Sequence, residues 1–241
     1  TQVYMKVAKW MLKKEIGGFV WIKEERKKKK EKSVLAESLV KGLAKVEEKH
    51  GAKHIINYVV EAAITPKDAQ AVKELYIDLI KAGAKSVAIK PTAIVPLSTS
   101  AAAAESNLPQ LTAALVEILQ AASGKDVRVE LDSEWSGLLG LTTKAFFAAT
   151  AEVKDVYAVI ATQAYDERAE EMVVKPLIKA SRLRVMSGGK PLFARLVCGA
   201  NLLAEEQMRS ENGWDSTMMV KGEIPRAEAH RNYHDLLKLL I

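Results

Sequence analysis

One cysteine, Cys198, occurs among the 241 residues, so an intrachain disulfide is excluded. The lack of a CxxC pair or a Cys/His cluster also excludes a cysteine-based structural zinc site. Long hydrophobic runs are missing as well, since no stretch reaches the roughly 18 consecutive apolar residues that a membrane-spanning helix needs. Neither GxGxxG nor GxxxxGK(S/T) follows a strand-like run. We therefore expect a chain from a reducing compartment with no transmembrane segment.

Positive charge is concentrated in one short segment. The net charge is +6, from 36 Lys and Arg against 30 Asp and Glu, and the run Lys23–Lys32 (KEERKKKKEK) alone holds seven basic and three acidic residues. The rest of the chain is nearly balanced. The run predicts a solvated helix face or a mobile arm, and a contact with RNA, an acidic protein surface or anionic lipid is the alternative.

Both ends of the sequence lack the usual markers of a chain end. The first residue is Thr1, and Leu236–Ile241 (LLKLLI) lies within an apolar helical pattern that has no cap or glycine stop. We therefore expect both ends to be cut or to continue. A processed organellar precursor would account for the N-terminus, because a transit peptide is removed from the mature chain.

Two patterns divide the chain. Residues 1–50 predict a helical arm, because apolar residues keep helical spacing before Gly17 and again over Ser33–His50. From His54 onward, short apolar runs rich in Val and Ile alternate with amphipathic helices. The expected strands are His54–Glu61, Ser86–Val95, Val127–Asp132, Val156–Thr162 and Leu192–Cys198. The expected helices are Pro66–Ala82, Leu108–Ser123, Leu138–Glu152 and Glu167–Ser181.

Strands that are apolar nearly throughout and alternate with helices predict a parallel sheet covered by helices. Periodicity alone leaves two architectures open, a doubly wound sheet and a (β/α)8 barrel. Polar residues at the carboxyl ends of the strands favour the barrel, whose chemistry takes place at that rim. These residues are Glu61, Lys90, Asp132, Gln163 and Arg195. We expect an α/β fold, a partial (β/α)8 TIM barrel of about five strand-helix units over residues 51–241, preceded by the helical arm.

Five short motifs occur in order along this pattern. INYVVE over residues 56–61 resembles a first-strand LDYxVE, and VAIKPTAI over residues 87–94 resembles AIKLTAL. LDSE over 131–134 resembles a third-strand DAE, TQAY over 162–165 resembles QAY, and RLVCGAN over 195–201 resembles RLV(K/R)GAY. In this order and at strand-helix spacing, the motifs resemble those of the proline dehydrogenase family, most closely its eukaryotic mitochondrial branch.

The resemblance implies oxidation of L-proline to pyrroline-5-carboxylate, with hydride transfer to N5 of a bound FAD and passage of the electrons to membrane quinone. It also implies a mitochondrial location, in the matrix or at the inner membrane. Lys90 and Asp132 match catalytic positions at the substrate and flavin edge, where the carboxylate fixes the ammonium group. The implied cofactor-binding residues are Gln163, Arg195, Gly199 and Ala200. The amide of Gln163 would form a hydrogen bond with the flavin ring, and the guanidinium of Arg195 would lie beside reduced flavin or its phosphates.

The sequence departs from the family pattern at three positions. Cys198 stands where the family has a basic residue, and Asn201 where it has Tyr, so a cation and an aromatic wall are lost together. Pro91 stands where the family has Leu; within a strand it would remove a ladder donor and could move Lys90. The family's later motifs, including an RRxxEN helix that binds the carboxylate of proline, are not among these residues.

Five parallel strands leave two open sheet edges, and we expect a protein partner to cover them. The departures favour a catalytically degenerate, flavin-free subunit, a pseudoenzyme with a structural role in a larger mitochondrial assembly. The alternative is part of an active FAD-dependent enzyme whose second barrel half is not in this sequence. No metal site is predicted, since the HxxxH spacing of His230 and His234 lacks the Glu of HExxH.

Overall fold

The computed structural model describes residues 29–51, 53–57, 63, 65–97, 106–199, 205 and 225–241. The chain divides into two compact units, Thr1–His54 and Ile55–Ile241. In the first unit, helix α2 runs over Lys29–His50 and so begins before the expected Ser33. The start of α2 overlaps the end of the basic run, and residues 23–28 of that run lie outside the described residues.

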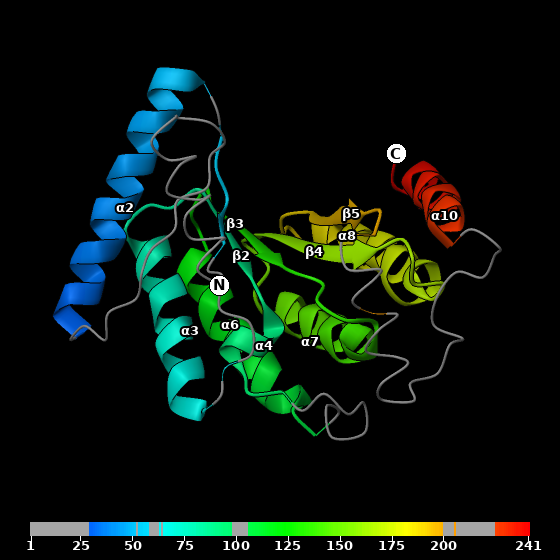
Figure 1. Ribbon diagram of the computed structural model, residues 1–241, viewed down its shortest axis with the longest axis horizontal. Helices are drawn as coiled ribbons and strands as arrows, with labels where there is room; N and C mark the ends of the chain where they lie inside the picture. Colours follow the sequence, from blue (N-terminus) through cyan, green and yellow to red (C-terminus); the bar gives the residue numbers. More distant parts are fainter. Residues whose placement is uncertain are drawn as a thin grey trace. The chain divides into compact units, whose positions relative to one another are not determined.

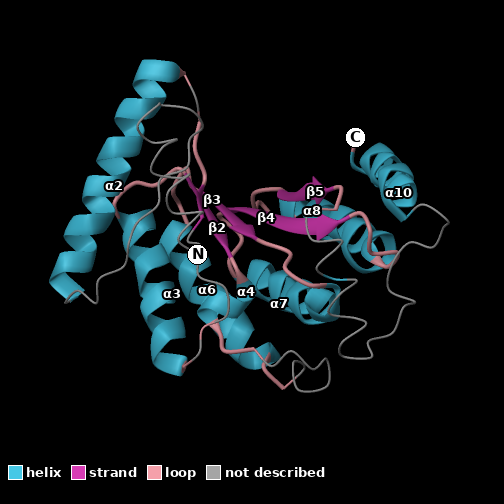
Figure 2. Cartoon of the chain, in the orientation of Figure 1, coloured by secondary structure: helices cyan, strands magenta, loops and turns pink. Residues whose placement is uncertain are grey.

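Within the described residues, the second unit is built on one parallel sheet of five strands (Figure 1, Figure 2). The strands are β1 Ile56–Asn57, β2 Ser86–Ile89, β3 Arg128–Leu131, β4 Tyr157–Gln163 and β5 Leu192–Val197. They lie in the order β1-β2-β3-β4-β5, so neighbours in the sequence are neighbours in the sheet. The predicted parallel pairing is confirmed.

Helices lie between the strands along the chain, and a helix also follows the last strand. They are α3 Pro66–Lys81, α4 Pro91–Ile94, α6 Leu108–Ala122, η1 Ser136–Leu138, α7 Leu139–Glu152, the π-helix η2 Glu170–Val174, α8 Lys175–Met186 and α10 Pro225–Leu240. Helix α3 begins as the sequence predicts, because Thr65 Oγ1 accepts a hydrogen bond from Asp68 N at 3.2 Å and Pro66 occupies the first turn. Gly83, at φ 98°, follows its end in the left-handed region that glycine favours.

The predicted strand Ser86–Val95 is wrong in its second half. Strand β2 ends at Ile89, and Pro91 is the first residue of the short helix α4. The fixed φ of proline and its missing N–H suit the first turn of a helix, where no intrahelical acceptor is available for that N–H. Pro91 therefore removes no bond from the sheet ladder, contrary to the sequence-based expectation.

The strand order places the crossover helices on one face of the sheet. Each connection joins adjacent parallel strands, and right-handed crossovers then put every helix on the same side. Helices α3, α6, α7 and α8 pack against β2, β3, β4 and β5 respectively. The strand residues toward them are buried and apolar: Val87, Ile89, Val129, Leu131, Ala158 and Ile160. A doubly wound sheet would reverse its strand order and carry helices on both faces. The sequential order is that of a (β/α)8 barrel, as predicted.

Helix α10 packs beside the π-helix η2 and the end of β4. Ala164, Ala169, Val174 and Leu236 form one buried apolar cluster across these elements. Asn232 Nδ2 also donates a hydrogen bond to Ala164 O at 2.7 Å, which fixes α10 at the carboxyl end of β4. Among the described residues, no helix combines the length and the apolar character needed to span a bilayer.

Candidate active site

The inner face of the sheet, opposite to the crossover helices, carries charged side chains. Alternate residues of a strand share a face. The register pairs Glu130 of β3 with Val159 of β4, and Ala161 of β4 with Arg195 of β5. Because Val159 and Ala161 are two residues apart, as are Glu130 and Asp132, all five side chains lie on the same face. Only the apolar Val159 and Ala161 of β4 separate Arg195 on β5 from the carboxylates that β3 presents. A long guanidinium side chain can therefore reach across the middle strand.

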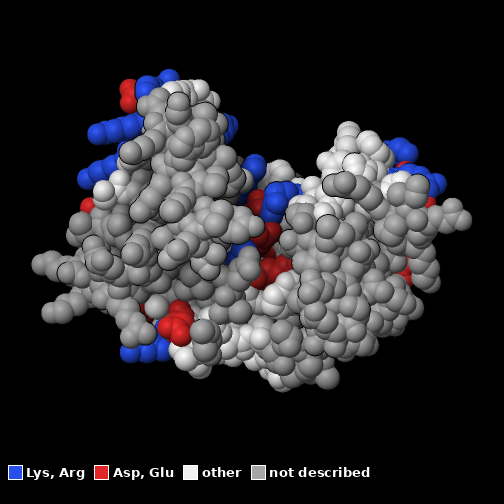
Figure 3. Space-filling model, in the orientation of Figure 1, with Lys and Arg blue, Asp and Glu red and all other residues white. Residues whose placement is uncertain are grey.

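Arg195 bridges two carboxylates. Its Nε lies 2.5 Å from Glu130 Oε1, and its Nη2 donates to Asp132 Oδ1 at 2.6 Å. The side chain of Glu130 is 4% exposed and that of Arg195 is 41% exposed, so the ion pairs run from the sheet interior toward solvent. Acidic and basic side chains lie side by side over the strands in the space-filling view (Figure 3). Burial raises the pKa of Glu130, and the Arg195 cation opposes that rise.

Gln163, the last residue of β4, lies beside the loop that follows β3. Its Nε2 donates to Ser133 O at 3.2 Å, and Ser133 N donates to Asp132 Oδ1 at 3.0 Å. The Gln163 side chain is buried, and its Oε1 has no hydrogen-bond partner within the part of the chain that the structure describes. An unsatisfied buried acceptor costs on the order of 1–3 kcal/mol. Gln163 therefore offers an acceptor that a donor group of a bound ligand would satisfy.

Glu134 fixes the turn that carries Lys90. Its Oε2 accepts a hydrogen bond from Thr92 N at 2.9 Å, and its Oε1 accepts one from Thr92 Oγ1 at 2.7 Å. Ala63 N donates to Thr92 O at 2.8 Å, so the residue after Pro91 is held on both sides. Burial raises the pKa of Glu134, while the bonds from Thr92 and the positive charge of Lys90 act in the opposite direction. Lys90 itself is half-buried at the start of α4.

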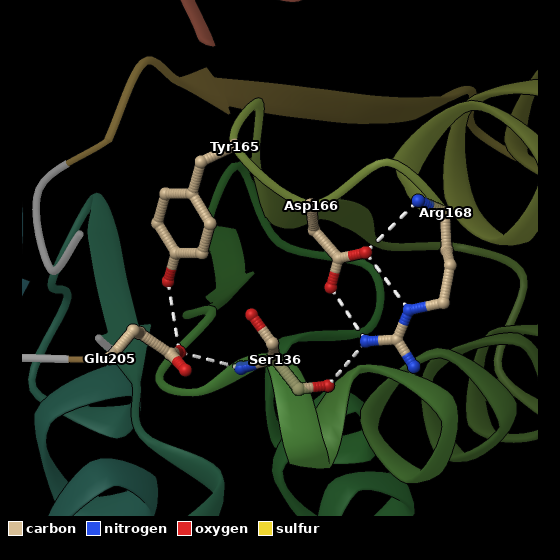
Figure 4. Close-up of polar contacts among 5 residues, drawn as sticks. All are labelled: Ser136, Tyr165, Asp166, Arg168 and Glu205. Atoms are coloured by element: carbon tan, nitrogen blue, oxygen red, sulfur yellow. Dashed lines mark hydrogen bonds and ion pairs between the residues drawn. The ribbon is translucent and has the colours of Figure 1, made fainter. Parts of the chain in front are cut away.

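A second polar network lies just beyond β3 and β4 (Figure 4). Glu205 Oε1 accepts hydrogen bonds from Ser136 N at 2.7 Å and from Tyr165 Oη at 3.0 Å. Arg168 pairs with Asp166, with Nη2 to Oδ2 at 2.6 Å and Nε to Oδ1 at 2.9 Å, and also donates to Ser136 O at 2.6 Å. Burial is the largest cause that raises the pKa of Glu205 and that of Tyr165.

The comparisons with known proteins agree with this arrangement. The family model described as proline dehydrogenase matches residues 40–241. The chain belongs to the proline dehydrogenase family. A search of the curated proteins finds no match.

Solved structures were compared with the chain, and two of the matches differ widely in similarity. Proline Utilization A (PutA) from Corynebacterium freiburgense superposes with a TM-score of 0.72 at 22% identity, over 86% of this chain and 22% of that one. At this identity the likeness supports the fold alone, and the chain spans 22% of the length of that protein. The 3-keto-D-glucoside 4-epimerase YcjR from E. coli gives a TM-score of 0.40 at 10% identity, over 86% and 87% of the two chains, which adds nothing to the assignment.

Four of the residues predicted as site residues lie at one rim of the sheet. Lys90, Asp132, Gln163 and Arg195 lie at or near the carboxyl ends of β2, β3, β4 and β5. The Asp132 carboxylate also binds the guanidinium of Arg195, a contact that the sequence did not predict. The expected contact of Asp132 with the Lys90 ammonium stays a prediction. The planar fork of arginine reaches both β3 carboxylates from the same face of the sheet. The roles of these residues toward substrate and flavin stay predictions.

The rest of the fifth motif is described only in part. Cys198 and Gly199 follow β5 and are half-buried. Ala200, predicted to bind the cofactor, lies outside the described residues, as do Asn201 and the strand-end residue Glu61. In the part of the chain that the structure describes, no group of three or more His, Cys, Asp or Glu is placed to hold a metal ion.

Three buried carboxyl groups of the rim were not predicted as site residues: Glu130, Glu134 and Glu205. Glu130 interrupts an apolar strand two residues before Asp132 and must share its face, and Glu134 ends the LDSE motif, so the sequence carried a signal for both. Glu205 opens a stretch that resembles a family motif, but its contact with Ser136, 69 residues away, has no local signal. Contacts of that kind depend on how the strands are ordered.

Proposed function

We propose that the chain forms part of a FAD-dependent proline dehydrogenase site, which oxidises L-proline to pyrroline-5-carboxylate. The observation that carries the proposal is the Arg195 bridge to Glu130 and Asp132, set beside Gln163 at the carboxyl-end rim of a barrel-type sheet. Family membership supports the chemistry, and the rim supplies the charged and hydrogen-bonding groups that such chemistry uses.

The described residues fit a flavin ring. The ring presents both N–H donors and carbonyl acceptors at one edge, and the buried Oε1 of Gln163 is an acceptor that receives no hydrogen bond from the described residues. Arg195, a permanent cation with 41% of its side chain exposed, is placed to face a group that gains negative charge. FAD would supply the hydride-accepting centre, while this chain supplies position and charge.

The carboxylates keep Arg195 in one orientation. The hydrogen bond from Nη2 to Asp132 and the ion pair with Glu130 restrain the guanidinium before any ligand arrives. Lys90 adds a second cation at the same rim, on a turn that Glu134 holds through Thr92. In this proposal, Arg195 and Lys90 would face the negative charge that develops on the reduced flavin.

Flavin binding tests the proposal directly. Quenching of FAD fluorescence by the purified chain should saturate, and Gln163→Leu and Arg195→Gln should each weaken the affinity by about tenfold, as expected for loss of one hydrogen bond or ion pair. Arg182→Gln, at an exposed position of α8, is the matched control and should bind like the unmodified chain. Absence of quenching by the unmodified chain would sink the proposal.

A second function is favoured by Cys198. The residue replaces the basic side chain of the family's fifth-strand motif at a half-buried position directly after β5. A flavin-free subunit with a structural role in a larger mitochondrial assembly needs no cation there. Migration of the native protein in a large complex, with no flavin extracted from it, would support this function. Recovery of FAD binding in Cys198→Arg would show that the substitution is what removed it.

A further inference from the structure

Glu205 joins two neighbouring loops at the carboxyl-end rim. The residue is 1% exposed, and its Oε1 accepts hydrogen bonds both from Ser136 N, in the loop after β3, and from Tyr165 Oη, in the loop after β4 (Figure 4). One oxygen atom therefore holds two segments that lie far apart in the sequence. A link of this kind restrains both loops only while its acceptor is present.

Arg168 closes the network from the other side. Its guanidinium donates to Ser136 O and is itself paired with Asp166. Ser136 is thus held through its N–H by Glu205 and through its carbonyl by Arg168. Both backbone groups of one residue are fixed by side chains from other segments, which leaves the loop little freedom.

The network lies next to the proposed flavin residues in the sequence and in space. Tyr165 comes two residues after Gln163, and Ser136 comes three residues after Ser133, whose carbonyl receives the Gln163 amide. Ser133 N in turn donates to Asp132 Oδ1. Movement of either loop would displace the partner groups that orient Gln163 and Asp132.

The second carboxyl oxygen of Glu205 adds no further link between described segments. Among the described residues, buried Glu205 Oε2 has no hydrogen-bond partner. The charged and titratable groups that act on it are Asp166, Tyr165 and Arg168, and the Arg168 cation is already paired with Asp166. Burial raises the pKa of Glu205 despite the bonds from Ser136 and Tyr165.

We propose that Glu205 is a positioning residue of the flavin site, which binds the loops after β3 and β4 together so that Asp132 and Gln163 keep their places at the rim. This inference rests on the proposed function and gives Glu205 no contact with flavin or substrate. It differs from a role in stability alone, because its effect is confined to two segments and reaches the cofactor through them.

Amide hydrogen exchange of the full chain without added FAD tests the link. Glu205→Ala should raise exchange by about tenfold in both 132–138 and 163–168, because both loops lose one shared acceptor. Exchange in β2 should not change. Glu205→Gln, which keeps the shape and an acceptor oxygen, should behave like the unmodified chain. Glu152→Ala, at an exposed position of α7, is the matched control.

FAD affinity, from fluorescence quenching, then separates positioning from stability. Glu205→Ala should weaken FAD binding by about tenfold at a temperature where the variant is fully folded, and Glu205→Gln should restore it. Unchanged exchange in either loop, or equal changes over the whole sheet, overturns the role of Glu205 even if the unmodified chain binds FAD. An unmodified chain that binds no FAD overturns the proposed function, and the inference falls with it.

Discussion

The buried charged side chains of the second unit differ in how their charge is balanced. Arg195 is half-exposed and meets two carboxylates, so its loss would leave Glu130 buried without a cation. Arg184 is 5% exposed and donates instead to backbone carbonyls, which carry no full charge. Burial lowers the pKa of Arg184. Substitution of Arg195 should therefore lower stability because a buried carboxylate loses its cation. Substitution of Arg184 should lower stability because buried carbonyl groups lose their donor.

Replacing Arg195 by Leu should lower the free energy of unfolding at pH 7 by about 2 kcal/mol. The loss is smaller than the 3–5 kcal/mol typical of a fully buried pair, since solvent screens a side chain that is 41% exposed. Urea unfolding at several pH values measures it. The loss should shrink at acid pH, where Glu130 is protonated and needs no cation. A double variant with Glu130→Gln should lose less than the sum of the two single changes. A pH-independent, additive loss would contradict this account.

Replacing Arg184 by Met should cost about 3 kcal/mol, because several buried carbonyls lose their donor at once. The guanidinium donates to Lys190 O at 2.7 Å, Lys154 O at 2.8 Å and Val156 O at 3.0 Å, and also to Thr150 O. Thermal unfolding of the variant is the measurement. Arg182→Met, two residues earlier and exposed, should leave the midpoint within a degree or two. Equal effects of the two substitutions would refute the role given to the carbonyl contacts.

At the scale of elements, most helices and strands could be predicted from local sequence patterns. The Thr65 cap, Pro66 and Gly83 mark the ends of α3 because each acts on its own backbone. Alternation of Val/Ile runs and amphipathic helices gave the order of strands and helices. The end of β2 was mispredicted because TAIV after Pro91 is as apolar as a strand, and apolarity alone does not separate a short buried helix from a strand.

The candidate site was predictable only where a motif marked it. The sequence marks Lys90, Asp132, Gln163 and Arg195 because each is a polar residue within or directly after a strand-like run and belongs to a family motif. The pairing of Asp132 with Arg195 depends on the register of β3, β4 and β5, which no local pattern encodes. The Glu205 link likewise depends on tertiary placement.

Buried Leu236 and a hydrogen bond from Asn232 help to hold helix α10 in position. Leu236 is fully buried in the cluster with Ala164, Ala169 and Val174. Leu236→Ala should destabilise the second unit by about 3 kcal/mol, the usual cost of a leucine-sized cavity. Leu239→Ala is the control, since Leu239 is 43% exposed on the same helix, and should cost less than about 1 kcal/mol. Chemical denaturation of both variants compares them, and equal losses would mean that α10 is not docked through Leu236.

At the scale of the whole molecule, three buried carboxyl groups with raised pKa values set a common pH dependence: Glu130, Glu134 and Glu205. Below a pH of about 4.5 such groups are protonated in both the folded and the unfolded chain. As the pH rises above that value, the unfolded chain releases protons that the folded chain retains, so the free energy of unfolding falls until the folded pKa values are passed.

Urea unfolding from pH 4 to pH 8 should show this fall. Glu205→Gln should make the curve flatter, because an amide does not titrate, whereas Glu152→Gln at an exposed site should leave its slope unchanged. A slope that is the same in the Glu205 variant and in the unmodified chain would show that Glu205 is ionised in the fold.

The reaction itself gives the most direct measurement of the central claim, that the rim of this sheet forms part of a proline-oxidising flavin site. The purified protein, expressed from its complete reading frame and loaded with FAD, is mixed anaerobically with L-proline while the visible spectrum is recorded. The account predicts that the flavin absorption bands bleach and that Arg195→Gln bleaches at least tenfold more slowly, since it removes the cation beside the developing negative charge. A bound flavin that L-proline does not bleach, or a protein that retains no flavin, would contradict the account.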